Sequence, residues 1–382
     1  MNSRKKIIRS STVPQSLETF CKGMLKELSE DYEVVALSSP GEALDIIAQR
    51  EGVRTIAVPM ERHISILKDL KSLLALIKVF RKERPDMVHS ITPKAGLLCM
   101  MAAWITRVPV RVHTFTGLVF PTATGLKKRI LMFTDRITCA CATHIIPEGE
   151  GVKKDLVVFK ITKKPLQVLG YGNIRGVDME YYSRSHEVEE KAAVLRDSSR
   201  FTFLFVGRIV RDKGINELVA AFQRLSIDYP QVRLYLVGGF EDTLDPVDDT
   251  TKDAIDNDEM IQYAGRQIGD GLLAYYAASD CFVFPSYREG FPNTVLEAGA
   301  MGLPSIVTDI NGSREIISDR FNGLIVPSHD ADALYEAMKW MLDNPEKRKS
   351  MASVSREHIA AHFEQGYVRK CLLDYYREIL QQ

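Results

Sequence analysis

The sequence has no long apolar run and no paired cysteines, and each absence removes a class of protein. No apolar stretch reaches the roughly 18–20 residues that a membrane-spanning helix needs. The basic N-terminal segment is not followed by a long apolar core, so no signal peptide is predicted. The six cysteines include no C-x-x-C pair, and Cys139 and Cys141 lie in an apolar segment where free thiols act as small hydrophobes. Zinc and disulfides are therefore not expected. The expected location is a reducing cytoplasm.

The whole chain also has no net charge, because its 50 Lys and Arg balance its 50 Asp and Glu. The two halves of the chain, however, are charged. Residues 1–172 hold 27 basic and 16 acidic residues, a charge of +11, and the remainder holds 23 and 34, a charge of −11. This asymmetry predicts an anionic partner for the first half. Nucleic acid is not the expected partner, because no aromatic residues are interleaved with the basic ones.

Two segments of the first half combine basic and bulky apolar residues: Leu67–Pro85 and Leu126–Phe133. A helix with a basic face and an apolar face can lie on an anionic membrane, here the inner face of the cell membrane. The alternative is that the apolar stripe packs in the core while the lysines are solvated. We favour the core for Leu67–Pro85, and both interpretations stay open for Leu126–Phe133.

Short apolar runs alternate with helical segments along the first half, which is typical of parallel sheets covered on both faces. Strands are predicted at Lys6–Arg9, Val34–Leu37, Thr55–Val58, Met87–Ser90, Val110–Thr114, His144–Ile146 and Leu166–Leu169. Helices are predicted at Ser16–Ser29, Ile66–Lys82 and Pro93–Thr106. The segment Tyr171–Arg184, rich in glycine and polar residues, is the predicted hinge.

A second series of the same kind follows the hinge. It begins with the segment Phe201–Arg208, in which a strand is predicted to end at Gly207. The other predicted strands are Val232–Val237, Ile261–Tyr263, Cys281–Phe284, Ser305–Thr308 and Gly323–Val326. Its predicted helices are Ile215–Asp228, Gly269–Ala278, Ala331–Asn344 and Gln365–Gln382, the last with Val368, Leu372, Tyr376 and Ile379 on one face. The predicted fold class is α/β, with two doubly wound domains that bind ligands at the carboxyl ends of their strands. The last helix must dock on one of the two domains.

Glu289 and Glu297 belong to the first of two charged motifs. An apolar strand leads into the polar loop of Glu289, and a helix is predicted to begin with Asn293 as its N-cap. The amides of residues 294–296 at this helix end would then suit a phosphate. Glu297, one turn further in, would repel phosphate unless it faced sugar hydroxyls. The motif favours a nucleotide sugar over the alternative, an ordinary capped helix behind a surface loop.

Arg208 and Lys213 belong to the second motif, FVGRIVRDKGINEL. Arg208 follows a predicted strand, and Lys213 precedes a predicted helix, whose positive end disfavours cations by a few tenths to about 1 kcal/mol. An anionic ligand would compensate, and a diphosphate fits, because Arg can hold two phosphate oxygens while Lys adds a point charge. The alternative is an ion pair with Glu289 or Asp212.

These motifs together resemble the retaining GT-B glycosyltransferases of family four. The resemblance extends from about Phe201 to Leu342 and rests on Gly207-Arg208…Lys213-Gly214, Tyr263-Ala264-Gly265-Arg266, Glu289-Gly290-Phe291-Pro292…Glu297-Ala298 and Asn311-Gly312-Ser313…Glu315. It implies two Rossmann-like domains that face a central cleft. Residues 1–172 would bind the acceptor, residues 178–364 would bind the nucleotide sugar, and the helix 365–382 would cross back to the first domain.

The resemblance also implies roles for the matching residues. Arg208 and Lys213 would bind the diphosphate, Glu297 the ribose and Glu289 the donor sugar. The other residues on the donor side would be Gly207, Gly265, Arg266, Gly290, Phe291, Pro292, Asn293 and Thr294, with Gly265-Arg266 near the nucleobase. Neither a metal ion nor another cofactor is required in this family, since the nucleotide sugar is a substrate.

The first half departs from the family pattern. The loop Ser10–Ser16 contains no glycine, where the family usually has a glycine-rich loop. Thr116-Gly117 replaces the frequent His-Gly pair and is expected on the sugar side, while a histidine, His113, comes three residues earlier. His113 either reaches the sugar as a catalytic residue or is a buried strand histidine satisfied by hydrogen bonds. The pattern resembles transferases that build bacterial surface polysaccharides, such as capsule and O-antigen, on lipid carriers.

The function implied is a hexosyl- or N-acetylhexosaminyltransferase that uses a UDP-sugar and a glycan or lipid-linked acceptor, with retention at the anomeric carbon. One alternative is a UDP-sugar epimerase, but we find no clear acid/base pair for it in the first half. Another is a non-catalytic nucleotide-sugar-binding protein. A dehydrogenase is disfavoured, because no G-x-G-x-x-G follows the first strand.

Overall fold

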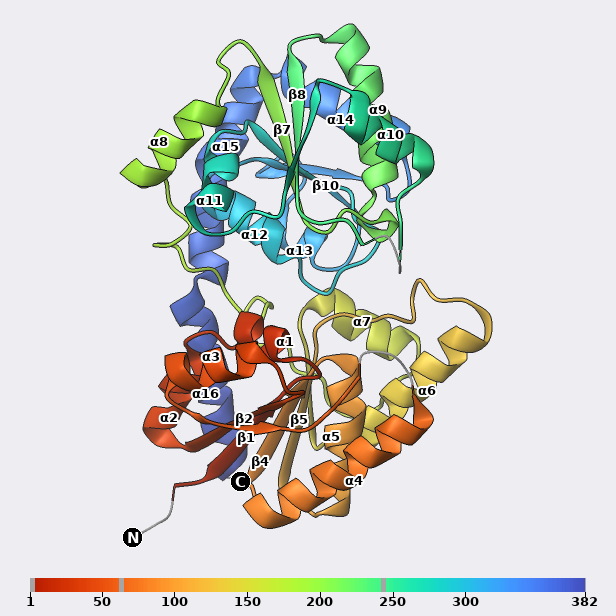
Figure 1. The fold of residues 1–382 in the computed structure, drawn as a ribbon, viewed down its shortest axis with the longest axis vertical. Coiled ribbons are helices and arrows are strands. Elements are labelled where there is room, and N and C mark those ends of the chain that lie inside the picture. The colour runs from red at the N-terminus through yellow and green to blue at the C-terminus, as the bar shows by residue number, and fades with distance from the viewer. Residues whose placement is uncertain (1–3, 62–64, 242–244, 382) are drawn as a thin grey trace. The chain divides into compact units, whose positions relative to one another are not determined.

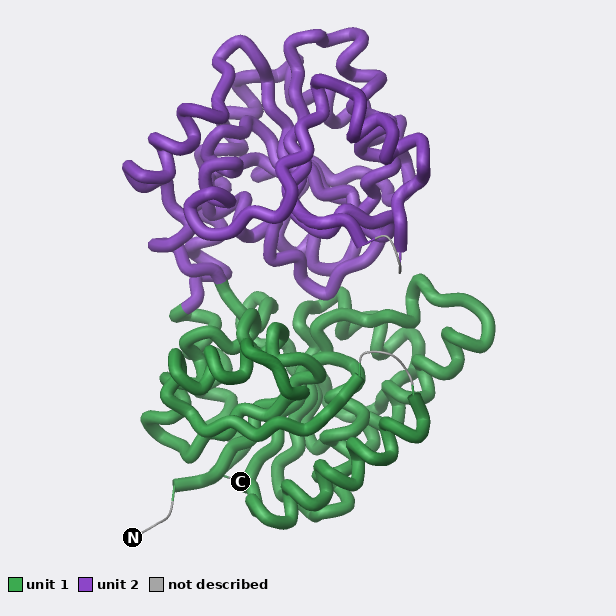
Figure 2. Tube along the Cα trace, in the orientation of Figure 1, with its two compact units in different colours: residues 1–176, 366–382 green, residues 177–365 purple. Residues whose placement is uncertain are grey.

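The computed structural model of the protein describes residues 4–61, 65–241 and 245–381, and it divides into two compact units. Unit 1 comprises Met1–Gly176 and Gly366–Gln382, and unit 2 comprises Val177–Gln365 (Figure 2). The predicted domain limits, 1–172 with 365–382 and 178–364, differ from this division by a few residues. Residues 1–3 and 382, which begin and end the predicted first domain, lie outside the described residues.

Unit 1 contains a six-stranded parallel sheet in the order β3-β2-β1-β4-β5-β6 (Figure 1). The strands are β1 (Lys6–Ser10), β2 (Glu33–Ser38), β3 (Arg54–Ala57), β4 (Met87–Ile91), β5 (Val110–Phe115) and β6 (His144–Pro147). Successive strand side chains point to opposite faces, so the adjacent residues Ile7 and Ile8 are both buried but lie in different clusters of the core. Apolar residues at consecutive positions are what a sheet covered on both faces requires.

The helices of unit 1 are α1 (Pro14–Phe20), α2 (Met24–Asp31), α3 (Glu42–Glu51), α4 (Ile66–Glu83), α5 (Pro93–Ile105), α6 (Gly125–Cys141), α7 (Glu150–Val158) and α16 (Gln365–Gln381). Helices α4 to α7 pack on one face of the sheet. On the other face, Leu372, Tyr376 and Ile379 of α16 share a cluster with Ile7 of β1. The predicted apolar stripe of the last helix is therefore confirmed, and its partner is unit 1.

Two predicted elements of unit 1 are wrong. The helix predicted at Ser16–Ser29 is broken into α1 and α2, because Gly23 has a φ of 75° and the buried carboxylate of Glu51 accepts the amides of Gly23 and Lys26 at the start of α2. The strand predicted at Leu166–Leu169 is only a single parallel bridge between Leu166 and Ile145. The chain turns away from the sheet at Gly170, which has a φ of 56°.

Unit 2 contains a second six-stranded parallel sheet, in the order β12-β11-β10-β7-β8-β9. Its strands are β7 (Phe201–Val206), β8 (Val232–Val237), β9 (Ile261–Gly265), β10 (Cys281–Phe284), β11 (Ser305–Thr308) and β12 (Gly323–Val326). Its helices are α8 (His186–Leu195), η1 (Arg211–Lys213, one 3₁₀ turn), α9 (Ile215–Asp228), α10 (Asp249–Asn257), α11 (Gly269–Ala277), α12 (Asn293–Ala300), α13 (Ser313–Ile316), α14 (Ala331–Asp343) and α15 (Pro345–Phe363). The strand order reverses between β7 and β10, and such a reversal is where open α/β sheets bind ligands. Among the described residues, no helix has both the length and the apolar character needed to cross a membrane.

Candidate donor site at the carboxyl ends of the unit 2 strands

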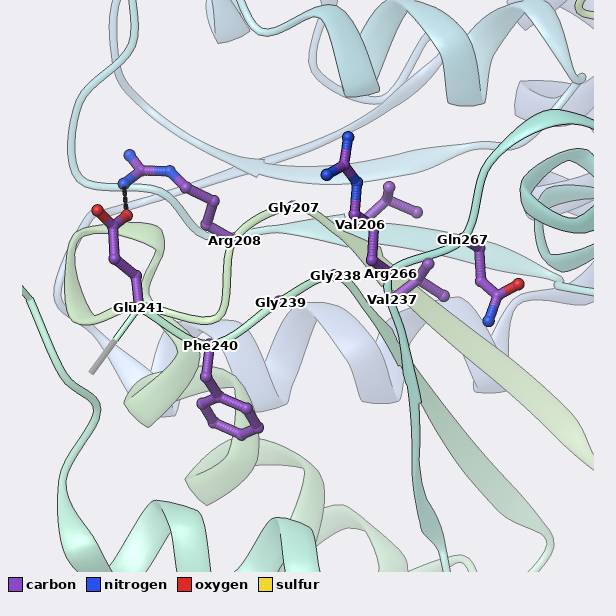
Figure 3. Close-up of a pocket in the computed structure, with 10 residues that line it drawn as sticks. All are labelled: Val206, Gly207, Arg208, Val237, Gly238, Gly239, Phe240, Glu241, Arg266 and Gln267. Atoms are coloured by element: carbon purple, nitrogen blue, oxygen red, sulfur yellow. Dashed lines mark hydrogen bonds and ion pairs between the residues drawn. The ribbon is translucent and has the colours of Figure 1, made fainter. Parts of the chain in front are cut away.

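A pocket of about 400 Å³ opens at the carboxyl ends of β7, β8 and β9 (Figure 3). It is lined by Val206, Gly207, Arg208, Val237, Gly238, Gly239, Phe240, Glu241, Arg266 and Gln267. Three of the predicted donor residues, Gly207, Arg208 and Arg266, are thus brought together although they come from two different strand ends. Another predicted donor residue, Gly265, ends β9 with a φ of 64°, a conformation that favours glycine.

The loop after β8 is the part of this pocket that the sequence did not reveal. Gly238 has a φ of 150°, and a Cβ atom there would lie 1.7 Å from the carbonyl oxygen of Gly207. The two strand ends can therefore approach each other only if residue 238 is a glycine. The signal in the sequence was the pair Gly238-Gly239 directly after an apolar strand, and the charged residue of the same loop is Glu241.

Arg208 forms an ion pair with Glu241, and Figure 3 shows the two side chains turned toward each other. An ion pair was the predicted alternative to diphosphate binding, but with Glu289 or Asp212 as the partner. The partner is instead a residue of the neighbouring loop. The Arg208 side chain is 59% exposed, so a ligand can reach its guanidinium.

Lys213 ends the short 3₁₀ turn η1 and stands directly before Gly214, the N-cap of α9, so it precedes this helix as predicted. Its ammonium group forms an ion pair with Glu289 and lies 5.0 Å from the centroid of the Phe284 ring. The following Gly214 has a φ of 69°, and a Cβ atom there would lie 2.1 Å from the carbonyl oxygen of Pro285. The glycine thereby brings η1 against the end of β10, where Glu289 follows.

Several side chains fix the loop of Glu289. Ser286 donates a hydrogen bond of 2.7 Å to the Glu289 carboxylate, and the Arg288 guanidinium donates one of 2.9 Å to Asp212 in η1. The Tyr287 hydroxyl donates to the Glu217 carboxylate in α9, with O···O distances of 2.7 and 2.6 Å. This hydrogen bond, together with burial, raises the pKa of Tyr287. Lys213 and Glu289 are therefore held in one network.

The motif Asn311-Gly312-Ser313 has a structural place beside this loop. Gly312 has a φ of 75°, and a Cβ atom there would lie 2.5 Å from the carbonyl oxygen of Gly290 and 2.7 Å from the Cα atom of Phe291. The amide of Gly312 donates to the Glu315 carboxylate at 3.1 Å. The glycine thus lets α13 pack directly on the Gly290-Phe291 backbone.

The start of α12 differs from the prediction. The N-cap is Pro292, and Asn293 is already the first helical residue. The amides of Val295 and Leu296 donate to the carbonyl oxygen of Pro292 at 3.2 and 3.4 Å, so the predicted set of three free amides is wrong. Proline provides no side-chain acceptor, and the first turn therefore closes on the backbone.

Glu297 lies one turn inside α12, as predicted, with 6% of its surface exposed. Its carboxylate accepts a hydrogen bond of 3.2 Å from the Tyr276 hydroxyl of α11. A buried carboxylate needs hydrogen-bond donors, and neutral hydroxyl groups such as that of Tyr276 can supply them.

The remaining predicted site residues belong to unit 1. Thr116 and Gly117 directly follow β5 and are partly exposed. His113, within β5, is only 1% exposed and bonds to the Ser90 hydroxyl through Nδ1 at 2.9 Å. Burial lowers the pKa of His113 to about 3, so its ring is neutral. A Cβ atom on Gly96 of α5 would lie 2.4 Å from the same ring. The structure thus favours the buried strand histidine over the catalytic one.

Within the described residues, no three His, Cys, Asp or Glu side chains are grouped as a metal site would require. The charged groups near the strand ends of unit 2 include Arg208 and Lys213 with their acidic partners, Arg266, and the buried carboxylate of Glu297. A doubly wound unit with such groups at its topological switch point, joined to a second doubly wound unit, defines a GT-B glycosyltransferase.

Comparison with known proteins identifies the family. The chain belongs to the family described as "Glycosyl transferases group 1", matched over residues 187–358, and residues 17–172 match the "Glycosyl transferase 4-like domain". It is therefore an enzyme, a glycosyltransferase of family four.

Two curated relatives extend this result. The chain is 31% identical over 388 residues to the capsular polysaccharide biosynthesis glycosyltransferase CapM of Staphylococcus aureus, with 99% of this chain and 98% of CapM covered. It is 30% identical over 301 residues to the Escherichia coli UDP-Gal:alpha-D-GlcNAc-diphosphoundecaprenol alpha-1,3-galactosyltransferase, with 77% and 76% covered.

Among solved structures, Anabaena Alr3699/HepE in complex with UDP superposes with a TM-score of 0.81 over 98% of this chain and 100% of its own, at 16% identity. At that identity the likeness concerns the fold, and it confirms the prediction of two Rossmann-like units of the GT-B type.

Proposed function

We propose that this glycosyltransferase transfers a hexose or an N-acetylhexosamine from a UDP-sugar to a lipid-linked glycan, with retention at the anomeric carbon, in the synthesis of a bacterial surface polysaccharide. The observation that carries the proposal is the pocket at the switch point of unit 2, which Gly207, Arg208 and Arg266 line. The same unit holds the ion pair of Lys213 with Glu289 and the buried carboxylate of Glu297. The donor and acceptor follow from the relatives, whose names include a UDP-galactose donor and a diphosphoundecaprenol acceptor. The relatives named above are transferases, which favours transfer over epimerisation or mere binding.

The chemistry breaks the bond between the anomeric carbon and a phosphate oxygen and forms a bond to the acceptor oxygen on the same face. Negative charge then develops on the diphosphate. Arg208 and Lys213 would stabilise this charge, and such preorganised contacts are typically worth about 10²–10³-fold in rate each. We propose that no metal ion is needed, because these two cations supply the positive charge. The departing phosphate oxygen would accept the proton of the acceptor hydroxyl, so that no separate general base is required.

The donor would be oriented by groups that the structure holds in place. Glu297 would accept hydrogen bonds from the ribose hydroxyls. Glu289, fixed by Ser286, would contact the sugar together with the Gly290-Phe291 backbone. The acceptor would bind unit 1 at Thr116-Gly117, where neutral groups follow β5. His113 has no part in this proposal.

Unit 1 would also contact the membrane that carries the acceptor. Helix α6 exposes Leu126, Ile130 and Phe133 next to three consecutive cations, residues 127–129. The prediction that the stripe of Leu67–Pro85 is core is wrong for the first part of α4, where exposed apolar residues are Ile66, Leu67, Leu70 and Leu74. Exposed apolar side chains flanked by lysines suit the surface of an anionic bilayer.

The donor is tested by a thermal-shift screen across UDP-, GDP- and ADP-sugars. A ligand that binds only the folded protein stabilises it by RT ln(1 + [L]/Kd), about 2.7 kcal/mol when the concentration is 100 times Kd. We expect a shift with a UDP-sugar and a smaller one or none with the other two series. A shift with GDP-sugars alone would show that the donor is a GDP-sugar and not a UDP-sugar. If no nucleotide sugar of the three series gave a shift, the proposed function would be contradicted.

A further inference from the structure

We propose that Glu241 is a built-in counter-ion of the donor site. In the empty enzyme it neutralises Arg208, and in the product complex it competes with the nucleoside diphosphate for the same guanidinium and so speeds product release. This inference rests on the proposed function, in which Arg208 binds the diphosphate.

An acidic side chain is out of place in a pocket for a diphosphate. Glu241 lines the pocket and has its carboxylate on the Arg208 guanidinium. When a diphosphate is bound to Arg208, a carboxylate on the same guanidinium repels it, because like charges a few ångströms apart disfavour each other. Binding alone would therefore be better served by a neutral residue at position 241.

The ion pair does not result from a chance approach of two long side chains. The amide of Gly207 donates to the carbonyl oxygen of Val237 at 2.9 Å, and the amide of Ile209 donates to that of Gly239 at 2.8 Å. The parallel pairing of β7 and β8 thus continues past the ends of both strands, through a bridge between Ile209 and Phe240. Arg208 and Glu241 are carried by these two paired segments, which keeps their backbones side by side.

The two cations of the site differ in what their partners can do. The partner of Lys213 is Glu289, which has a proposed role toward the sugar, and Ser286 holds the Glu289 carboxylate in place. The Glu241 side chain is 25% exposed, and within the described part of the chain its carboxylate pairs with Arg208 alone. It can therefore leave the guanidinium for water when a diphosphate arrives, and return when the product leaves.

Product release limits turnover in many enzymes. A carboxylate that competes for the Arg208 guanidinium lowers the affinity of the enzyme for a diphosphate, both when the donor binds and when the nucleotide product leaves. Since a partly exposed ion pair is worth about 0.2–1 kcal/mol, its contribution corresponds to a change of up to about fivefold in Kd. The effect is small enough to leave donor binding intact.

The test is the affinity of UDP for the full-length protein, measured by titration calorimetry. In Glu241→Gln, we expect UDP to bind about two- to fivefold more tightly and kcat to fall, with a burst of product in the first turnover. The control is Asp248→Asn, which removes one carboxylate from the ion pair between Asp248 and Arg211, outside the residues that line the pocket. This control should leave both the Kd of UDP and kcat unchanged.

A double-mutant cycle separates the counter-ion from a general change of charge. In an Arg208→Ala background, Glu241→Gln should no longer tighten UDP binding, because the group for which they compete is gone. An unchanged or weaker affinity in the single variant overturns the inference, and so does equal tightening in both backgrounds. If the wild-type protein does not bind UDP at all, the proposed function fails as well, and that result is distinct from either of these.

Discussion

Glu297 is a buried residue whose structural and functional roles can be separated. Its carboxylate is bonded to Tyr276 and is proposed to hold the ribose hydroxyls. Hydrogen bonds to a charged group are worth about 1.5–3 kcal/mol, so Glu297→Ala should raise the KM for the donor by roughly 10- to 100-fold. Kinetics with a UDP-sugar measure this change. Tyr276→Phe is the control, because it removes the hydroxyl that donates to Glu297 while the Glu297 carboxylate stays, and it should lower stability with little effect on KM. Equal KM values in Glu297→Ala and the wild type would remove the ribose assignment.

A second prediction at the scale of a single residue concerns Asp135 and the dependence of stability on pH. This residue of α6 is largely buried, and burial raises the pKa of its carboxyl group to about 7. Since an unfolded Asp titrates near 4, folding favours the protonated form. The cost to stability is therefore absent at low pH, grows as the pH rises above about 4, and is complete above about 7.

Asp135→Asn should consequently stabilise the protein at pH 8, by about 1–3 kcal/mol, and stabilise it less at pH 5. Urea unfolding at both pH values gives the two differences. Asp45→Asn, at an exposed position of α3, is the matched control and should change stability equally little at both. A stabilisation by Asp135→Asn that did not depend on pH would contradict the argument from burial.

At the scale of elements, α6 is the helix that tests the membrane contact. Leu126, Ile130 and Phe133 lie on its exposed side, and changing all three to Ser should reduce the fraction of protein that pellets with phosphatidylglycerol vesicles. The same fraction should fall with added salt and be low with phosphatidylcholine, because the neighbouring cations contribute. Val194→Ser with Ile227→Ser, two exposed apolar residues of unit 2, is the control and should pellet like the wild type. Pelleting unaffected by both salt and the triple change would exclude this surface.

The elements that the sequence predicted well are those in which the spacing of apolar residues alone distinguishes a strand from a helix. Strands such as β8 and β10, and the helix α9, have the predicted bounds because an uninterrupted apolar run or a helical stripe is unambiguous. The break between α1 and α2 was not predictable, since the group that caps α2 is Glu51, 28 residues beyond Gly23 in the chain. The N-cap of α12 was misplaced by one residue because Asn is a common cap, whereas the geometry of Pro292 decided the start.

On the scale of the molecule, the sequence predicted which residues would gather at the strand ends of unit 2. It also offered an ion pair with Glu289 as an alternative, which Lys213 forms, but it did not predict the partner of Arg208. Arg208 and Arg266 could be placed because each lies within two residues of the end of a strand in a parallel sheet. The partner of Arg208 could not, since it depends on the close approach of Gly238 to the Gly207 carbonyl. The sequence left two interpretations of His113 open for a similar reason, because the burial of its ring depends on the space that α5 leaves at Gly96.

A change in the C-terminal helix α16 can test whether the stability of unit 1 and UDP binding by unit 2 are independent. Tyr376 of α16 accepts a hydrogen bond of 2.8 Å from the buried Arg9 of unit 1 and also bonds to His89. Tyr376→Phe keeps the ring but leaves the buried guanidinium with one partner fewer, which should cost about 1–3 kcal/mol of stability. The donor pocket lies wholly in unit 2, so the Kd of UDP should not change.

Urea unfolding and UDP titration of the same Tyr376→Phe sample give both values. Tyr375→Phe, the neighbouring tyrosine of α16, is the matched control: it shares the cluster with unit 1 but has no hydrogen bond to Arg9, and we expect a smaller loss of stability. If Tyr376→Phe weakened UDP binding while unit 1 stayed fully stable, α16 would act on the donor site itself. If the two variants were equally stable, the buried Arg9 would draw its stability from Cys21 and His89 rather than from the last helix.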